Sequence, residues 1–340
     1  MGILQWLFGG DDEATDSRVD EAVIDLGIEQ IVNMIDPRLK LVTGYRGKLA
    51  EAVTQAVLYC RELEAKIPAS VTASAAAWPD SPLLRALFAT AQDVPTIFSR
   101  SGAVQEFFEA TPGADAAYAG VRFVIREEQR FGMRVQGEVV QRDVAQTAVS
   151  FGDKKVPLAV TTEREIRTEI RRRAFKFLIT EALDQITSAN TRREDLTINR
   201  TMLKARRDML RRHRGSMESV LEDGSEIDTK VEALEELLAL NAHSLAEFPT
   251  AEKTLEYILK RVKSVLTHGA QYIQVKPVTL RLDPMNIVVP AGAAEPANEI
   301  VLPEVSVKGK PSLSLIVARF PRGELIPRAS LADEARRLLG

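Results

Sequence analysis

The spacing of the apolar residues changes three times along this chain, and no other feature of the sequence constrains the fold as strongly. Between residues 19 and 110 apolar residues recur every three or four positions, as they do in amphipathic helices. From Val121 they alternate with polar residues, which is typical of half-buried strands. Helical spacing returns at Thr162, and short β-branched runs follow Gly269. Blocks of helix and strand in this order predict an α+β fold.

The first block predicts a helical domain over residues 19–112. Its first helix should end before Pro37, because proline has no N–H and restricts the residue that precedes it. Ser81 followed by Pro82 is a typical helix start, with a side-chain oxygen at the N-cap and proline at the first helical position. The later helices of this domain are expected over residues 47–67, 81–91, 92–99 and 101–110.

The second block, residues 113–220, predicts a β-hairpin that leads into long basic helices. The alternating segments 130–140 and 145–151 would form the hairpin, with a turn at 141–143. Residues 121–125 would supply a third strand. A polar run at 187–195 is expected to break the helical region in two.

The third block, residues 221–340, predicts two helices followed by a small sheet. A linker is expected at 222–226, Pro249 should separate the two helices, and Gly269 should end the second one. Short β-branched strands then follow, with prolines and glycines between them. Ser330 should cap a closing helix.

The sequence carries no motif for catalysis or metal binding. Its three histidines lie 25 or more residues apart, and no HExxH, CxxC, Walker A, GxGxxG or GxSxG pattern occurs. Cys60 is the one cysteine, so an internal disulfide is excluded and a reducing compartment is indicated. No run of 18 apolar residues is present. We therefore expect a cytoplasmic protein without metal or cofactor, and nothing in the sequence supports an enzyme.

Charge is distributed very unevenly for a chain with a net charge of −3. Residues 1–36 hold nine acidic residues and one base, whereas residues 162–214 hold 15 basic residues and eight acidic ones. On a helix, five of these bases fall at steps of three and four and therefore share one edge. This basic stripe consists of Arg200, Lys204, Arg207, Arg211 and Arg214.

Four interpretations of the basic stripe stay open. It can be a solvated helix face with local ion pairs, or it can meet an acidic partner, either the amino-terminal segment of this chain or another protein. It can bind nucleic acid, although no aromatic residue lies between Phe177 and Phe248 to stack on bases. It can also lie on an anionic membrane surface.

Two further features are candidate contact sites. The first is an apolar tag at the amino terminus, which can fold back on the chain, dock on a partner or enter a lipid interface; it consists of Ile3, Leu4, Trp6, Leu7 and Phe8, and an acidic linker completes the segment 1–18. The second is a weak anion site, where Arg46 and Lys48 follow Gly44 at the start of a predicted helix.

These features predict a noncatalytic cytoplasmic interaction or scaffold protein that contacts an acidic partner through the basic stripe. The alternatives are a nucleic-acid-binding regulatory protein that uses the same helix and a peripheral membrane-associated protein that uses the apolar tag. Self-association is also expected, because Leu196, Leu203, Leu210 and Met217 recur at intervals of seven. No small-molecule substrate is inferred.

Overall fold

The described part of the chain divides into two compact units, and each unit draws on separate stretches of the sequence. The sheet unit contains residues 57–175 and the part of the chain after residue 268, and the helical unit contains residues 20–56 and 176–268. These units do not coincide with the consecutive domains expected at 19–112, 113–220 and 221–340, because the boundaries fall inside two long helices. The computed structural model describes residues 19–136, 139–214, 224–250, 253–290, 292–293 and 295–327.

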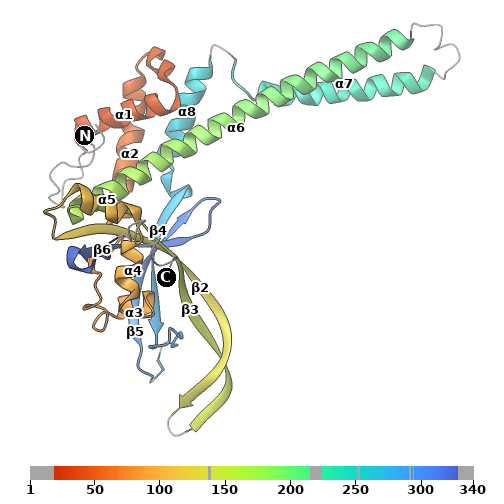
Figure 1. The fold of residues 1–340 in the computed structure, drawn as a ribbon. Coiled ribbons are helices and arrows are strands. Elements are labelled where there is room, and N and C mark those ends of the chain that lie inside the picture. The colour runs from red at the N-terminus through yellow and green to blue at the C-terminus, as the bar shows by residue number, and fades with distance from the viewer. Residues whose placement is uncertain are drawn as a thin grey trace, which may run out of the picture. The chain divides into compact units, whose positions relative to one another are not determined.

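A six-stranded sheet forms the centre of the sheet unit, and together with the helices it confirms the α+β prediction (Figure 1). Its path runs in the order β3-β2-β6-β5-β4 with antiparallel neighbours, and the short β1 pairs in parallel with β6. The strands are β1 Val71–Thr72, β2 Ala116–Gln136, β3 Val139–Val160, β4 Ile273–Leu282, β5 Asn298–Val307 and β6 Leu313–Pro321.

The predicted hairpin exists, but its turn is not at residues 141–143. Strand β2 runs without interruption from Ala116 to Gln136, so residues 121–125 are part of the hairpin and not a third strand. The register continues to the pair Gln136 and Val139, and residues 141–143 lie within β3. The register shifts near this point, and Asp143 has a φ of 59°, a left-handed conformation that aspartate tolerates better than most residues. The polar run therefore accommodates a β-bulge and not a reversal of the chain.

Strand β4 also joins two segments that the sequence separates at Pro277. In the β4–β5 pair Pro277 lies directly opposite Pro303. Neither residue has an N–H to donate, so the two prolines fit only at a non-hydrogen-bonded pair of the ladder. On its other side, β5 pairs with β6 only at Glu304 and Val305, next to Pro303.

Three short helices pack against the sheet, whereas the sequence places them in an all-helical domain. They are α3 Pro82–Leu87, α4 Asp93–Ser99 and α5 Gly102–Ala110. Phe88, Phe98 and Phe108 are buried in one cluster with residues of the strands. The ring of Phe98 stacks on that of Phe320 in β6, with 4.8 Å between the ring centres. Helices this short cannot bury large aromatic side chains among themselves, and the sheet face supplies the missing surface.

The helical unit contains most of one very long helix. Helix α6 is continuous from Glu163 to Arg214, so the break predicted at 187–195 is wrong. That run contains neither glycine nor proline, and polar residues alone do not end a helix. Helix α7 begins at Gly224, inside the predicted linker. The other helices are α1 Glu21–Ile35, α2 Tyr45–Ala65, α8 Thr254–Thr267 and the 3-10 helix η2 Pro37–Leu41, and the helix expected after Ser330 lies outside the described residues.

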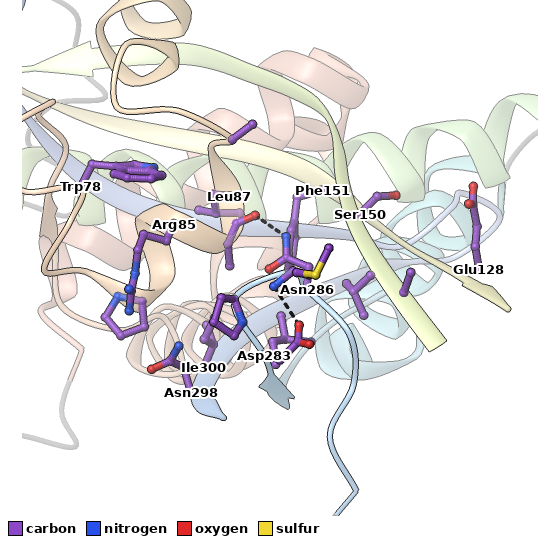
Figure 2. A pocket seen from close by; sticks show the side chains of 18 of the residues that line it. Trp78, Arg85, Leu87, Glu128, Ser150, Phe151, Asp283, Asn286, Asn298 and Ile300 are labelled. Atoms are coloured by element: carbon purple, nitrogen blue, oxygen red, sulfur yellow. Dashed lines mark hydrogen bonds between the residues drawn. The ribbon is translucent and has the colours of Figure 1, made fainter. Parts of the chain in front are cut away.

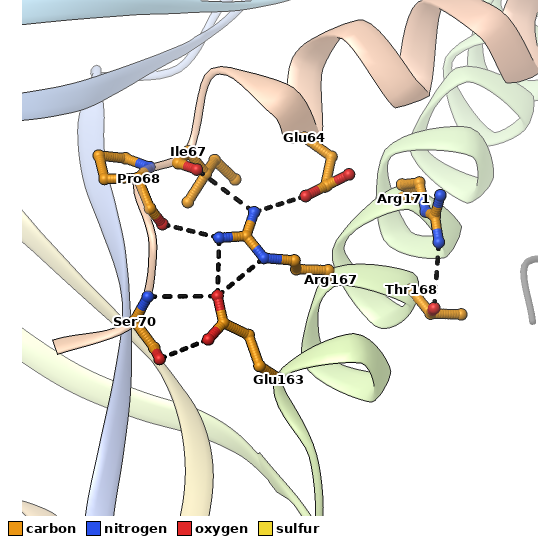
Figure 3. Close-up of polar contacts among 8 residues, drawn as sticks. All are labelled: Glu64, Ile67, Pro68, Ser70, Glu163, Arg167, Thr168 and Arg171. Atoms are coloured by element: carbon orange, nitrogen blue, oxygen red, sulfur yellow. Dashed lines mark hydrogen bonds and ion pairs between the residues drawn. The ribbon is translucent and has the colours of Figure 1, made fainter. Parts of the chain in front are cut away.

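A group of polar contacts in the sheet unit ties the end of α2 to the start of α6 (Figure 3). The Arg167 guanidinium lies 2.6 Å from Glu64 Oε1 and 2.9 Å from Glu163 Oε1. It also donates to the carbonyl oxygens of Ile67 and Pro68, at 3.3 and 2.9 Å. Glu163 in turn accepts hydrogen bonds from the backbone N–H and the hydroxyl of Ser70. One cation therefore satisfies two carboxylates and two carbonyls that follow a helix end.

Candidate interaction surface

The second half of α6 packs against α7, which runs back alongside it within the helical unit (Figure 1). On α6 the half-buried Leu196, Leu203 and Leu210 recur at intervals of seven, and on α7 the buried Leu234 and Asn241 do the same. The side-chain amide of Asn241 donates to the carbonyl oxygen of Leu196 at 3.0 Å. The leucine repeat that predicts self-association is thus half-buried in the single chain, where it lies along the α6 face that meets α7.

The structure splits the basic stripe into an engaged part and an exposed part. Arg207 donates two hydrogen bonds to Asp208 Oδ1, at 2.7 and 3.0 Å, and Arg211 forms an ion pair with Glu235 of α7. The hydrogen bond from Arg207 lowers the pKa of Asp208. Arg207 and Arg211 are therefore paired with acidic residues of this chain.

Arg200 and Lys204 form the exposed part of the stripe. Neither residue has an ion-pair partner within the part of the chain that the structure describes. Arg214 is the last residue of α6, and its side chain lies outside the described atoms.

Large apolar side chains are exposed on another side of the same helix, because at about 100° per residue Met202 lies roughly 160° around α6 from both Arg200 and Lys204. Ile198, Met202 and Met209 of α6 are 55%, 65% and 60% exposed, and Leu237 and Leu240 of α7 are also exposed. An isolated exposed apolar residue needs no explanation, but exposed residues at steps of four and seven along one helix form a ridge. The apolar ridge and the pair Arg200 and Lys204 are therefore two separate exposed surfaces of α6.

The two helices of this hairpin carry opposite charge. Residues 190–212 of α6 hold eight basic and three acidic residues, whereas α7 holds five acidic residues and one lysine. The basic stripe alone does not predict the ion pair between Arg211 and Glu235 of α7. The negative charge of residues 224–246 is the sequence signal that could have predicted this ion pair, because two adjacent helices of opposite charge favour packing as an antiparallel pair.

The two residues of the predicted anion site do not act together. Arg46 binds Asp25 Oδ1 at 2.8 Å and Glu29 Oε1 at 2.7 Å, so its charge is already neutralised. Gly44 has a φ of 69°, which is the conformation that a tight turn between η2 and α2 requires. Lys48 lies elsewhere, on a shallow hollow of about 580 Å³ whose other charged or titratable lining residues are Glu256, Lys260, Lys263 and His268.

Other candidate chemistry is limited in the described residues. No group of three or more His, Cys, Asp or Glu residues there could hold a metal ion. Burial raises the pKa of the Cys60 thiol to about 12, with a small opposing effect from the charge of Arg171. None of the described helices has both the length and the apolar character needed to cross a bilayer. The apolar tag (Ile3, Leu4, Trp6, Leu7 and Phe8) lies outside the described residues.

Comparison with known proteins adds no family to this geometry. No protein-family model, curated protein or solved structure matches the chain. The function proposed below therefore rests on the contacts, exposure and charge of the α6–α7 hairpin.

Proposed function

We propose that the protein is a noncatalytic cytoplasmic interaction or scaffold protein that contacts an acidic protein partner through α6. The observation that carries this proposal is the exposed pair Arg200 and Lys204, which lie one turn apart on a continuous helix. Two cations without an ion-pair partner among the described residues favour an approaching carboxylate.

A protein partner fits this surface better than nucleic acid does. A duplex carries phosphates along its whole length and would also meet the carboxylates of α7, which hold a net negative charge. A protein can present acidic residues only where α6 presents cations. No aromatic side chain lies between Phe177 and Phe248 to stack on bases.

A membrane surface is a weaker fit for the same hairpin. The segment has no tryptophan or tyrosine that could anchor it at a lipid interface. The acidic residues of α7 would be repelled by anionic headgroups. The apolar tag remains a separate prediction for membrane contact, and Trp6 gives it a fluorescent reporter.

The test compares two double charge reversals of equal charge change. Arg200→Glu/Lys204→Glu alters the exposed part of the stripe, and Lys253→Glu/Lys260→Glu alters two exposed lysines at α8 as a matched control. Each purified variant is used to capture proteins from nuclease-treated lysate, and the captured acidic proteins are then purified and titrated against the variants by calorimetry. We expect the stripe variant to lose an acidic partner that wild type and control both retain, with weaker binding as salt increases.

Three outcomes would overturn this proposal. The stripe variant can retain every partner that wild type binds, or capture can depend on nucleic acid that the nuclease removes. In the third outcome, wild type binds labelled duplex DNA or anionic vesicles and the stripe variant does not, which assigns the same residues to another class of partner. Circular dichroism of each variant shows whether the helices are intact.

A further inference from the structure

A cavity of about 760 Å³ lies within the sheet unit (Figure 2). Four parts of the chain form its wall: the segment from Trp78 to Ala89, the β2–β3 hairpin, the end of β4 with the loop that follows it, and the start of β5. The loop is fixed against β3 by hydrogen bonds in both directions, from Val149 N–H to the Asn286 carbonyl and from Val288 N–H to the Thr147 carbonyl, both 2.8 Å. The side chain of Asn286 donates to the Ala86 carbonyl at 3.0 Å and so joins the loop to α3.

Much of the cavity wall is apolar and partly aromatic. Trp78, Leu87, Phe151 and Ile300 line it (Figure 2). The indole N–H of Trp78 donates to the Phe88 carbonyl at 2.9 Å, which fixes the ring. A volume of this size is in the range of pockets that bind small organic molecules.

The acidic residues at the cavity are already satisfied by the protein. Glu128 pairs with Arg130 at 2.7 Å, and both lie on β2. Asp283 Oδ1 accepts the backbone N–H groups of Met285 and Ile287, each at 2.8 Å. The charge of Glu128 is thus balanced by Arg130, whereas the Asp283 carboxylate is stabilised by backbone N–H groups.

Of the three basic residues that line the cavity, Arg130 pairs with Glu128, but Lys154 and Arg85 form no ion pair with a described residue. Lys154 is half-buried; its ammonium donates to the Phe151 carbonyl and lies 5.8 Å from the centre of the Phe88 ring. No carboxylate of the described residues forms an ion pair with it, and burial lowers its pKa against an opposing effect from Asp93. Arg85, on the same wall, also has no ion-pair partner among the described residues.

We propose that this cavity is a binding site for a small organic carboxylate with an aromatic or branched aliphatic body. The carboxylate would pair with Lys154, and the body would pack against Trp78 and Phe151. A desolvated ammonium without an anionic partner gains more from such a ligand than an exposed one does, because water has already been removed from it. The apolar wall supplies the hydrophobic contribution that a free inorganic anion could not use.

The experiment uses 4-phenylbutyrate and its neutral analogue 4-phenyl-1-butanol as probes. Trp78 lines the cavity, so its fluorescence reports binding in a Trp6→Phe background that removes the other tryptophan. We expect wild type to bind the carboxylate more tightly than the alcohol. Lys154→Met should weaken carboxylate binding roughly tenfold or more and leave alcohol binding unchanged.

The neighbouring Lys155 provides a matched control, because it is exposed and is not part of the cavity wall. Lys155→Met should bind both probes as wild type does, and Lys154→Arg, which retains the charge, should bind the carboxylate within a few-fold of wild type. If Lys154→Met does not fold, Arg85→Met tests the second cation and should weaken carboxylate binding to a smaller extent. Equal affinity for the two probes, equal losses at Lys154 and Lys155, or no saturable change would overturn the proposal.

Discussion

Replacing Arg167 by alanine should destabilise the sheet unit far more than the same change at Arg173. Both arginines lie on α6 and bind glutamates, but Arg167 is 22% exposed and Arg173 is 51% exposed. Removing Arg167 leaves Glu64 and Glu163 without their shared cation and leaves two carbonyls without a donor. Removing Arg173 leaves Glu169 with Arg172 still bound.

The magnitude follows from how far water reaches each pair. Breaking a fully buried ion pair by deleting one partner costs about 3–5 kcal/mol. Glu64 and Glu163 are 15% and 32% exposed, so partial hydration of the abandoned carboxylates should reduce the loss to about 2–3 kcal/mol. An exposed pair is worth about 0–1 kcal/mol, and Arg173→Ala should therefore stay within that range.

The assay is urea unfolding followed by the fluorescence of Trp78, in a Trp6→Phe background so that the signal comes from the sheet unit. With a slope of about 2–3 kcal/mol per molar urea, Arg167→Ala should unfold at a midpoint lower by about 1 M. Arg173→Ala should shift the midpoint by no more than about 0.5 M. If the two variants unfold at the same midpoint with unchanged slopes, the contacts around Arg167 contribute nothing net and the reasoning is wrong.

Four other perturbations test particular contacts. Burial raises the pKa of Glu163, but hydrogen bonds from Ser70 and Arg167 together lower it from its ordinary value of 4.5. Its stabilising contribution is therefore present above that value and is lost as the pH falls through the folded-state pKa, so Glu163→Gln should flatten the acid side of a pH series of urea midpoints. Cys60 should resist iodoacetamide at pH 8 in native protein and react once urea unfolds it, and rapid native labelling would contradict its burial. Asn241→Leu should slow hydrogen exchange of α7, because a buried polar group is replaced by an apolar one, and faster exchange would show that its bond to Leu196 matters more than packing. Gly44→Ala should cost about 1 kcal/mol in thermal unfolding, since a φ of 69° strains any residue with a Cβ, and an unchanged melting temperature would refute that.

Local patterns predict the helices and strands well where a chemical stop signal is present. Helix α1 ends at Ile35, before Pro37, and Ser81 Oγ caps α3 by accepting the backbone N–H of Leu84 at 3.3 Å. Where the signal is only polarity, the prediction fails: residues 187–195 continue a helix and residues 141–143 continue a strand. Polarity reports solvent exposure, and it does not by itself report a change in backbone direction.

Long-range packing is the part that the sequence pattern does not contain. Each of the two units is built from separate stretches of the sequence, and this division depends on which apolar faces pack together. Helical periodicity does not predict that packing, because it is the same whether a helix packs on a sheet or on another helix. The basic stripe is predictable as an edge of a helix, but the capture of Arg211 by Glu235 depends on how α7 folds back. Lys154 has no distinguishing sequence context, and only the surrounding cavity singles it out.

The facing prolines of β4 and β5 have a consequence for how the sheet assembles. Residues in an antiparallel ladder alternate between positions that donate inward and positions that donate outward. If the register between β4 and β5 shifted by one residue during folding, either Pro277 or Pro303 would face the other strand at a hydrogen-bonded position. Proline has no backbone N–H to donate there. The same shift would turn the apolar side chains of the strand to the wrong face. The two prolines thus disfavour a one-residue shift in the register of β4 and β5, so that this misaligned pairing does not become a kinetic trap.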